Sequence, residues 1–380
     1  MPSAATLRAA ARSHVREIVE PNVAAWERAA QFPRDATRHA ARDGLLGLFA
    51  PVEAGGQGLS FADGMAVFEE LGRGDAAYAF ALSMHNAVAA AIGRFGSDSV
   101  KARWATALTG GEALGGFSLT EPHAGSDAAA ITTRIVRDGG GYRVTGRKAW
   151  VTLVGEADVF LVGCRTGEQR GASDMAMVVV DRRADGVRVT RRYETMTSAF
   201  LPIGEMQLDG VPIDASAVLA PPGQGMQAAL AAIDVARCDI AAIAVGLAGR
   251  ALEIALEHTG RRRIFDGVVL DQQAIQFMLA DVETNIVAAR LLYEHAARLL
   301  GTREGSVAAA HAKRFNPDIA LAAAVTCAET LGSYGWLNDT PLPRFIGLAK
   351  MLQTVDGTTE VQRLVIARDL VARARGGGET

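Results

Sequence analysis

The stretch Phe117-Ser-Leu-Thr-Glu-Pro-His-Ala-Gly-Ser-Asp127 lies where the character of the chain changes. An apolar run, residues 114–119, leads into it, and hydroxyl and carboxylate side chains follow. Pro122 and Gly125 then interrupt any regular structure. The stretch predicts a strand edge that enters a turn whose backbone N–H groups and hydroxyls face a ligand. An ordinary turn with capping Ser and Asp side chains is the alternative interpretation.

Amphipathic helices are predicted before this stretch, up to about residue 112. Apolar residues recur three and four positions apart, and Gly, Pro or Asp-Gly separates the segments. The expected helices cover residues 7–19, 34–46, 61–71, 76–95 and 99–108. The Gly-rich loop 50–60 has no preceding strand and lacks the spacing of a nucleotide fingerprint, so a turn is the better interpretation.

From about residue 113 the apolar period changes to two, and β-branched residues become frequent. Asp138-Gly-Gly-Gly141 predicts a hairpin between strands at 131–136 and 142–145. Further strands are expected at residues 159–164, 175–181, 187–192 and 205–208. The region closes with Pro212 and the loop Pro221-Pro-Gly-Gln-Gly225, whose two prolines argue against a dinucleotide-binding turn.

The chain returns to long helices from residue 226 onward. They are expected at residues 226–259, 271–301, 306–331, 343–353 and 359–374. Several are apolar on more than one face, as in helices that are buried by other helices, including those of a partner subunit. The sequence therefore predicts a mainly α protein with helices at 1–112, a small middle β-domain at 113–225 and a helical bundle at 226–380.

The composition disfavours several classes of protein. The chain has 380 residues and a formal net charge of −3 with interspersed acids and bases, so no basic face for nucleic acid is expected. Its three cysteines lie far apart without a Cys-x-x-Cys pair, which favours buried thiols over disulfides or a metal site. No apolar run is expected to span a bilayer. Glu17 and Glu20 follow the Arg- and Ala-rich start, so we expect the first helix of a cytoplasmic protein, not a transit peptide.

Two strings in the middle of the chain carry a resemblance to a known family. Thr120-Glu-Pro-x-x-Gly-Ser-Asp127 and, further along, Gly146-Arg-Lys-Ala-Trp-Val-Thr152 resemble the flavin-binding middle domain of the acyl-CoA dehydrogenase family. Motifs in the same order extend the resemblance over nearly the whole chain. It implies a β-barrel-like middle domain, a C-terminal four-helix bundle, an FAD cofactor, and a homotetramer or homodimer with FAD at the subunit interface.

Trp150 and Thr152 are the first candidates for flavin contacts. A Trp offers a flat stacking face, and a hydroxyl two residues further on lies on the same side of a strand. On the residues alone, a core Trp is an equal alternative. The resemblance implies that both residues contact the flavin. It assigns further flavin contacts to Phe117, Leu119, Thr120 and Ser126. Ser126 also matches a position that touches the substrate.

Three arginines at 261–263 follow a helix end, where basic residues commonly complement the helix dipole. The resemblance implies instead that Arg262, Phe265 and Gln273 of a neighbouring subunit grip the FAD diphosphate. It implies further cofactor contacts by Glu329, Gly332, Thr358 and Glu360. Glu329 stands where the family has Gln, and its added negative charge would be offset by the three arginines.

A charged pair, Asp234 and Arg237, lies on an apolar helix, where a buried charge is costly unless it is paired or binds a ligand. An internal salt bridge is one interpretation. The resemblance implies that this Asp-x-x-Arg reaches the CoA part of a thioester, and the Arg fork suits oxygen-rich groups. It also implies a substrate contact at Gly357.

The segment Val355-Asp-Gly-Thr-Thr-Glu360 matches the family motif Glu-Gly-Thr-x-Glu, whose first Glu is commonly the base that removes the α-proton of the substrate. The resemblance makes Asp356 the base here, whereas the residues alone would also suit a helix start. Aspartate is one methylene shorter, and a misplacement of roughly 1 Å can cost about a hundredfold in rate. Some relatives place the base at the position of Ala236, so no second carboxylate competes there.

The resemblance implies FAD-dependent α,β-dehydrogenation of an acyl thioester in lipid and fatty acid metabolism. Asp356 would remove the α-proton while the β-hydride passes to flavin N5, and an electron-transfer flavoprotein would accept the electrons. The segment 195–202 departs from the family, so both CoA and an acyl carrier protein stay open as carriers. Nitroalkane oxidases, relatives that use an Asp base, suggest a flavin oxidase or monooxygenase as an alternative. A non-catalytic flavin-binding helical assembly is a third.

Overall fold

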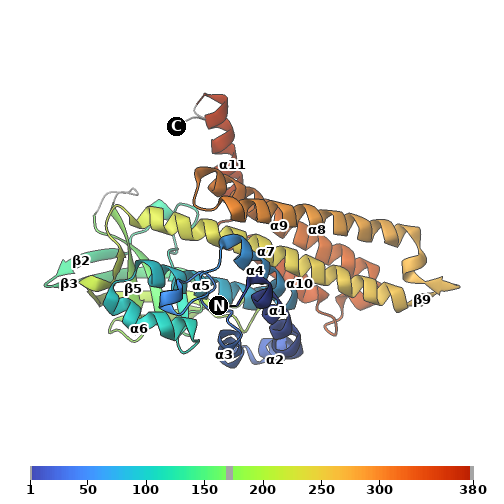
Figure 1. Ribbon diagram of the computed structural model, residues 1–380, viewed down its shortest axis with the longest axis horizontal. Helices are drawn as coiled ribbons and strands as arrows, with labels where there is room; N and C mark the ends of the chain where they lie inside the picture. Colours follow the sequence, from blue (N-terminus) through green and yellow to red (C-terminus); the bar gives the residue numbers. More distant parts are fainter. Residues whose placement is uncertain (1, 168–173, 377–380) are drawn as a thin grey trace. The chain divides into compact units, whose positions relative to one another are not determined.

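The computed structural model describes residues 2–167 and 174–376 (Figure 1). The chain divides into two compact units. Unit 1 comprises Met1–Gly64 and Ala81–Ala236, and unit 2 comprises Met65–Phe80 and Arg237–Thr380. Helices α4 (Phe61–Gly74), α5 (Ala76–Phe95) and α7 (Gly225–Arg261) contribute residues to both units. The fold is mainly helical with a small β-domain in the middle of the chain, as predicted, and the division into three domains stays a prediction.

The N-terminal part of unit 1 consists of helices. They are α1 (Ala4–His14), α2 (Glu20–Ala29), α3 (Arg34–Arg42) and α6 (Asp98–Thr109). Ser3 and Ser97 cap α1 and α6, because their side-chain oxygens accept hydrogen bonds from the backbone N–H groups of Thr6 and Val100.

The segment after α1 differs from the single helix predicted at 7–19. Val15–Val19 forms a π-helical turn, and α2 then continues the helix across Pro21. Proline is tolerated there because it stands in the first turn of α2. The predicted helix 34–46 ends earlier, at Arg42, and Gly44 follows with a φ of +75°.

One eight-stranded sheet forms the β-domain of unit 1. Its strands are β1 (Gly115–Ser118), β2 (Arg134–Asp138), β3 (Gly141–Thr152), β4 (Val159–Arg165), β5 (Met175–Asp181), β6 (Val187–Arg192), β7 (Ile203–Asp214) and β8 (Val218–Ala220). The strand order is β6-β7-β3-β2-β4-β5-β8, and β1 pairs with β4. The hairpin predicted at residues 138–141 is confirmed, because Asp138 pairs with Gly141 at its end.

Strand β7 is longer than predicted and runs through Pro212 instead of ending before it. Pro212 lies opposite Arg143 of β3, whereas β6 pairs only with the part of β7 from Gly204 to Leu208. Because β6 does not extend along β7 as far as Pro212, the missing N–H of the proline removes no bond between these two strands.

The core of unit 1 lies between the sheet and the helices. Strand β4 is buried along its whole length, and β5 is buried except at its last residue. Their apolar side chains pack in one cluster with residues such as Val88 of α5 and Leu108 of α6. The three cysteines of the chain are buried thiols outside any disulfide, as predicted.

Unit 2 is built from helices around α9 (Arg303–Thr330), which contacts α8 (Gln273–Leu299), α10 (Leu342–Leu352) and α11 (Thr359–Ala374). A two-stranded hairpin, β9 (Arg263–Ile264) and β10 (Gly267–Val268), connects α7 to α8. A short 3-10 helix, Gly332–Trp336, follows α9. The C-terminal part of the chain is thus the helical bundle that the sequence predicts.

Helix α5 corrects one expectation. By length and composition, residues Ala76–Phe95 form a helix that is long and apolar enough to cross a membrane, although no such run is expected from the sequence. Of its apolar window, 83% is buried inside the folded chain, as in the core helix of a globular protein. Burial in the core explains the apolar composition of α5.

Helices α4 and α7 approach each other closely through two glycines of unit 2. A Cβ at Gly246 would lie 2.0 Å from the carbonyl oxygen of Glu69, and one at Gly72 would lie 2.4 Å from that of Ile243. Both contacts are with backbone atoms, so neither can be relieved by a rotation of a side chain.

We expect Gly246→Ala to lower the free energy of unfolding by about 1–3 kcal/mol, because the added methyl group overlaps the backbone of α4. Gly249→Ala on the same helix is the matched control, since its Cβ would meet only the end of the Arg73 side chain, at 3.2 Å, and no backbone atom. Helix propensity should make the control neutral or more stable by up to about 1 kcal/mol. Urea denaturation measures both, and equal stability of the two variants would contradict the close contact.

Candidate active site

A buried ion pair connects the turn predicted at residues 120–127 to β3. Lys148 Nζ lies 2.9 Å from Glu121 Oε1, and both side chains are almost fully buried. Glu121 also accepts hydrogen bonds from the N–H and hydroxyl groups of Thr132 and Thr133. Burial alone would raise the pKa of Glu121, but Lys148 and these hydrogen bonds outweigh it and lower the pKa to about 2. The carboxylate therefore stays ionised and holds the turn in place.

Two further bonds join the turn to the segment that contains Trp150. Ala149 N–H donates a 2.9 Å hydrogen bond to the Thr120 carbonyl, and Lys148 Nζ donates to the carbonyl of Leu119. The structure thus brings together the two strings on which the family resemblance rests.

Trp150 is an exposed, strained residue of β3. Its φ is +56°, within a bulge where the pairing with β7 shifts between Lys148 and Val151. Its side chain is 62% exposed, so Trp150 is not part of the core of unit 1. A non-glycine residue with positive φ costs of order 1–3 kcal/mol and persists where the surrounding structure holds it, often at a functional site. The indole therefore offers a flat face to a ligand.

Tyr193 supports this indole and was not among the predicted site residues. The two rings lie 4.5 Å apart between centroids and are inclined by 44°. The Tyr193 hydroxyl donates a 2.9 Å hydrogen bond to Glu205, which also accepts from Arg147 Nε at 2.9 Å. Burial and the adjacent Glu205 raise the pKa of Tyr193. The pairing of β6, β7 and β3 creates this group, so no local motif could reveal it.

The other predicted residues of unit 1 differ in exposure. Phe117 and Thr120 are partly buried, Leu119 and Thr152 are buried, and Ser126 is exposed. A Cβ at Gly163 would lie 2.5 Å from Leu119 Cδ1, so the Leu119 side chain packs closely against β4. These residues, together with Trp150, fit a planar ligand with polar edges, because they combine an exposed aromatic face with hydroxyl groups.

Asp356 of unit 2 has the strained geometry of a functional residue. It precedes α11 and has a φ of +51°, and Gly357 follows with a φ of +93°. The residue is partly exposed, but its Oδ2 is shielded from solvent and has no hydrogen-bond partner among the described residues. Burial raises the pKa of Asp356 to about 6, against the opposing charges of Lys313 and Arg237. Such a carboxylate can accept a proton at neutral pH.

The backbone around Asp356 is fixed by hydrogen bonds within unit 2. Thr358 caps α11 by accepting from Val361 N–H, and Gln362 Nε2 donates to the Gly357 carbonyl at 2.9 Å. The Arg237 guanidinium lies 3.9 Å from the position of a Cβ at Gly357. The structure therefore brings Arg237, Asp356 and Gly357 together. Asp234 lies on the same helix within unit 1 and is partly exposed.

The residues predicted to grip a diphosphate gather around the β9–β10 hairpin. Arg262 lies over the ring of Tyr334, 5.4 Å from its centroid, in the segment that begins at Gly332. Phe265 is 87% exposed with a φ of +50°, and Gln273 is exposed at the start of α8. Glu329 is also exposed, near the end of α9, and Glu360 is exposed in the first turn of α11.

Arg262 and Asp356 lie far apart in the single chain. Asp356 faces Arg237, and α7 continues without a break from there to Arg261. At 1.5 Å per residue this part of the helix is about 36 Å long. Figure 1 accordingly shows β9 and α11 well apart in unit 2. One chain cannot bring these two groups to the same small ligand.

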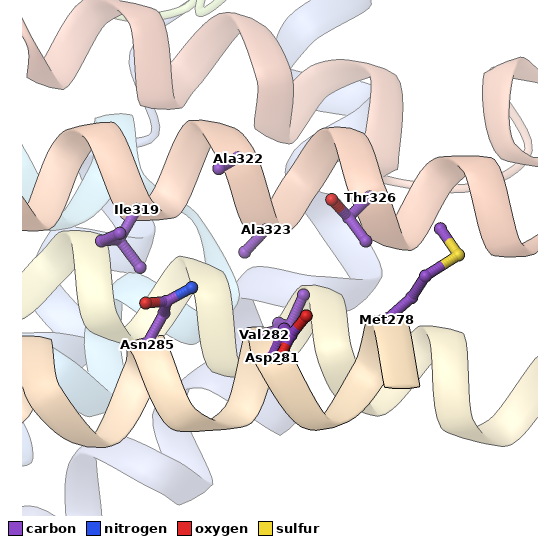
Figure 2. Close-up of a pocket in the computed structure, with 8 residues that line it drawn as sticks. All are labelled: Met278, Asp281, Val282, Asn285, Ile319, Ala322, Ala323 and Thr326. Carbon is purple, nitrogen blue, oxygen red and sulfur yellow. The ribbon is translucent and has the colours of Figure 1, made fainter. Parts of the chain in front are cut away.

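A pocket of about 210 Å³ lies elsewhere in unit 2, between α8 and α9. Figure 2 shows its lining residues, which are Met278, Asp281, Val282, Asn285, Ile319, Ala322, Ala323 and Thr326. None of the predicted site residues lines this pocket. The candidate site therefore consists of the residues around Trp150 and those around Asp356.

Comparison with known proteins gives matches over all three parts of the chain. Family models of the acyl-CoA dehydrogenase N-terminal, middle and C-terminal domains match residues 2–112, 116–211 and 223–371. An acyl-CoA dehydrogenase of Bacillus subtilis (strain 168) is 32% identical over 368 residues, which cover 96% of this chain and 97% of that protein.

Two solved structures are also similar. A glutaryl-CoA dehydrogenase from Mycobacterium smegmatis in complex with FADH2 has a TM-score of 0.90 at 28% sequence identity. The match covers 97% of this chain and 94% of the dehydrogenase chain. A chain in a structure described as the electron transferring flavoprotein of Acidaminococcus fermentans has a TM-score of 0.92 at 30% identity, with 97% of each chain covered.

We expect Lys148→Met to lower the free energy of unfolding by about 3–5 kcal/mol, because it leaves the Glu121 carboxylate buried without its cation. Since the pKa of Glu121 is lowered to about 2, the stability that the ionised carboxylate contributes is present above its unfolded pKa and is lost as the pH falls towards 2.

The matched control is Arg188→Met in the exposed pair with Asp209, where both side chains are 64% exposed. It should change the free energy of unfolding by less than about 1 kcal/mol. Denaturation at pH 7 measures both variants, and a small effect of Lys148→Met would show that the ion pair does not hold the turn.

Proposed function

The chain belongs to the acyl-CoA dehydrogenase family, and from this premise we propose that it dehydrogenates the α,β bond of an acyl thioester with Asp356 as the base. The family identifies it as a flavin-dependent oxidoreductase that acts on CH–CH groups, with FAD as cofactor. The choice of Asp356, the identity of the thioester and the electron acceptor belong to the proposal.

The observation that carries the proposal is the state of the Asp356 carboxylate. Its Oδ2 is shielded from water and has no donor among the described residues, so one lone pair is available for a substrate proton. A pKa of about 6 makes it a stronger base than an ordinary Asp while it is still mostly ionised at pH 7. A carboxylate that only capped α11 would have its oxygen atoms satisfied by backbone N–H groups.

The residues of unit 1 fit the isoalloxazine ring of FAD. The exposed indole of Trp150 supplies a stacking face, and the hydroxyls of Thr120, Ser126 and Thr152 supply polar contacts. Phe117 and Leu119 complete this set. When bound, FAD supplies the acceptor for the β-hydride. The backbone next to Asp356, including Gly357, would polarise the thioester carbonyl, and Asp234 and Arg237 would hold the carrier.

We assign the FAD diphosphate to residues of a second subunit, namely Arg262, Phe265 and Gln273, with Glu329 and Gly332 beside them. The length of α7 supports this assignment, because the short ribityl chain of one FAD cannot bridge the separation between Arg262 and the Asp356 end of α7 in one chain. Thr358 and Glu360 lie at the Asp356 end and would contact the cofactor from there. Cofactor binding would then require a homodimer or homotetramer.

Other parts of the proposal do not rest on the geometry of the site. From the sequence we place the enzyme in the cytoplasm, and from the family we place it in fatty acid metabolism with an electron-transfer flavoprotein as acceptor. The similarity to the Acidaminococcus fermentans chain supports this acceptor. The carrier is CoA or an acyl carrier protein. The Asp at the base position favours one alternative, a nitroalkane-oxidase-like enzyme that reduces oxygen.

We expect Asp356→Asn to retain FAD and to lose turnover by about a hundredfold to ten-thousandfold, because the amide cannot accept the α-proton. The measurement is the loss of flavin colour when a panel of acyl thioesters is added without air. Asp339→Asn, at an exposed position of the same unit, is the control and should react like the wild type. Full activity of the Asp356→Asn variant would exclude Asp356 as the base. If the wild type turns over nitroalkanes, and does so only when oxygen is present, the oxidase alternative would be favoured.

We expect the rate to rise with pH through about 6 and then level off. Burial raises the pKa of Asp356 from its ordinary value of 3.8 to about 6, and only the ionised form is a base. Below this pH the rate should fall about tenfold per pH unit. The measurement is a profile of kcat/KM against pH between pH 4.5 and 8 with a thioester substrate. The midpoint of its acid limb should lie about one unit below pH 7. A limb near pH 4 would show that Asp356 is not desolvated during the reaction.

A further inference from the structure

A buried lysine lies beside the turn that carries Asp356. Lys313 of α9 is fully shielded from solvent, and its Nζ donates a 2.7 Å hydrogen bond to the carbonyl oxygen of Leu352. Leu352 is the last residue of α10, where helix carbonyls lack an intrahelical partner and a cation is favoured. Lys313 therefore ties α9 to the chain just before Asp356.

The charges of Lys313 and Asp356 act on each other. Burial lowers the pKa of Lys313 to about 7, and Asp356 opposes that change more than any other residue does. In turn, Lys313 has a larger effect on the Asp356 carboxylate than Arg237 of α7. Three more charged groups act on Lys313: Arg237 of α7 lowers its pKa, whereas Asp318 of α9 and Glu360 of α11 raise it. The pair is thus a buried acid and a buried base, each of which favours the charged form of the other.

We propose that Lys313 is a positioning residue for Asp356: its ammonium group fixes the end of α10 through Leu352 and keeps the neighbouring carboxylate ionised. This inference rests on the proposed role of Asp356 as the base. The hydrogen bond to Leu352 alone does not require a charge, because a neutral donor could make it. A buried ammonium group is costly unless an opposite charge lies nearby. For Lys313 that charge is the carboxylate of Asp356, whose Oδ2 has no hydrogen-bond donor among the described residues.

The first test compares two lysines that contact the same part of the chain. Lys313→Met removes the buried charge and keeps a side chain of similar length. Lys350→Met is the matched control, because Lys350 is exposed and its Nζ bonds to Gln353 Oε1 at 2.9 Å. We expect Lys313→Met to retain FAD and to move the acid limb of kcat/KM up by about one pH unit or more. Lys350→Met should leave the limb in place.

An unmoved limb in an active Lys313→Met variant would overturn the proposal. A purely structural role would lower the rate at every pH without moving the limb, so the two roles differ in this readout. If the wild type itself does not turn over any thioester, the proposed function fails, and the second test then decides on Lys313 without any activity.

The second test is a double-mutant cycle with Lys313→Met and Asp356→Asn, measured by urea unfolding of the FAD-loaded protein. We expect a coupling of about 1.4 kcal/mol at pH 6.5, the free-energy equivalent of one pH unit, because both groups are mostly charged between their pKa values of about 6 and about 7. The coupling should disappear at pH 5, where Asp356 is protonated, and no coupling at pH 6.5 would overturn the proposal.

The double-mutant cycle also tests the proposal if the Lys313→Met variant does not fold. If Lys313→Met alone fails to fold, the double variant should recover a folded yellow protein, because removing both members of a buried pair is tolerated better than removing one. Failure of both the single and the double variant would show that Lys313 serves the fold independently of Asp356, which contradicts the proposal.

Discussion

The cost of burying the carboxylate of Asp356 is the constraint on which the arrangement of its neighbours in unit 2 depends. Removing a carboxylate from water is costly, and here Lys313 and Arg237 offset the cost without satisfying Oδ2. The positive φ of Asp356 is tolerated because Asp is among the few side chains that adopt this conformation readily. An aspartate at this position is therefore compatible with the backbone that carries it.

The two units use the same construction. In unit 1, the buried pair of Glu121 and Lys148 fixes a turn beside Trp150, whose φ is positive. In unit 2, Lys313 fixes the end of α10 before Asp356, whose φ is also positive. In both cases a buried lysine donates to a main-chain carbonyl close to a strained residue. Such strain persists only where surrounding contacts hold it, as expected for groups that must meet a ligand in a fixed geometry.

The sequence predicted the elements that local pattern determines. The bounds of α5 and α11 agree with the prediction because helical periodicity and caps define them, and Asp138 marks its hairpin. The π-helical turn after α1 escaped prediction, because it breaks no sequence rule. Trp150 could be proposed from its motif, but its exposure and bulge depend on pairing with β7. Lys313 stayed unnoticed because its importance arises only where α9 meets the end of α10.

The exchange of α-hydrogens with solvent tests the central claim most directly. A phenylacetyl thioester can lose its α-proton but carries no hydrogen on its β-carbon that could be transferred. In neutral D2O the FAD-loaded protein should introduce deuterium at the α-carbon of this compound, as measured by mass spectrometry, and the Asp356→Asn protein should not. Equal exchange by both proteins, or none by the wild type, would contradict the assignment of Asp356 as the base.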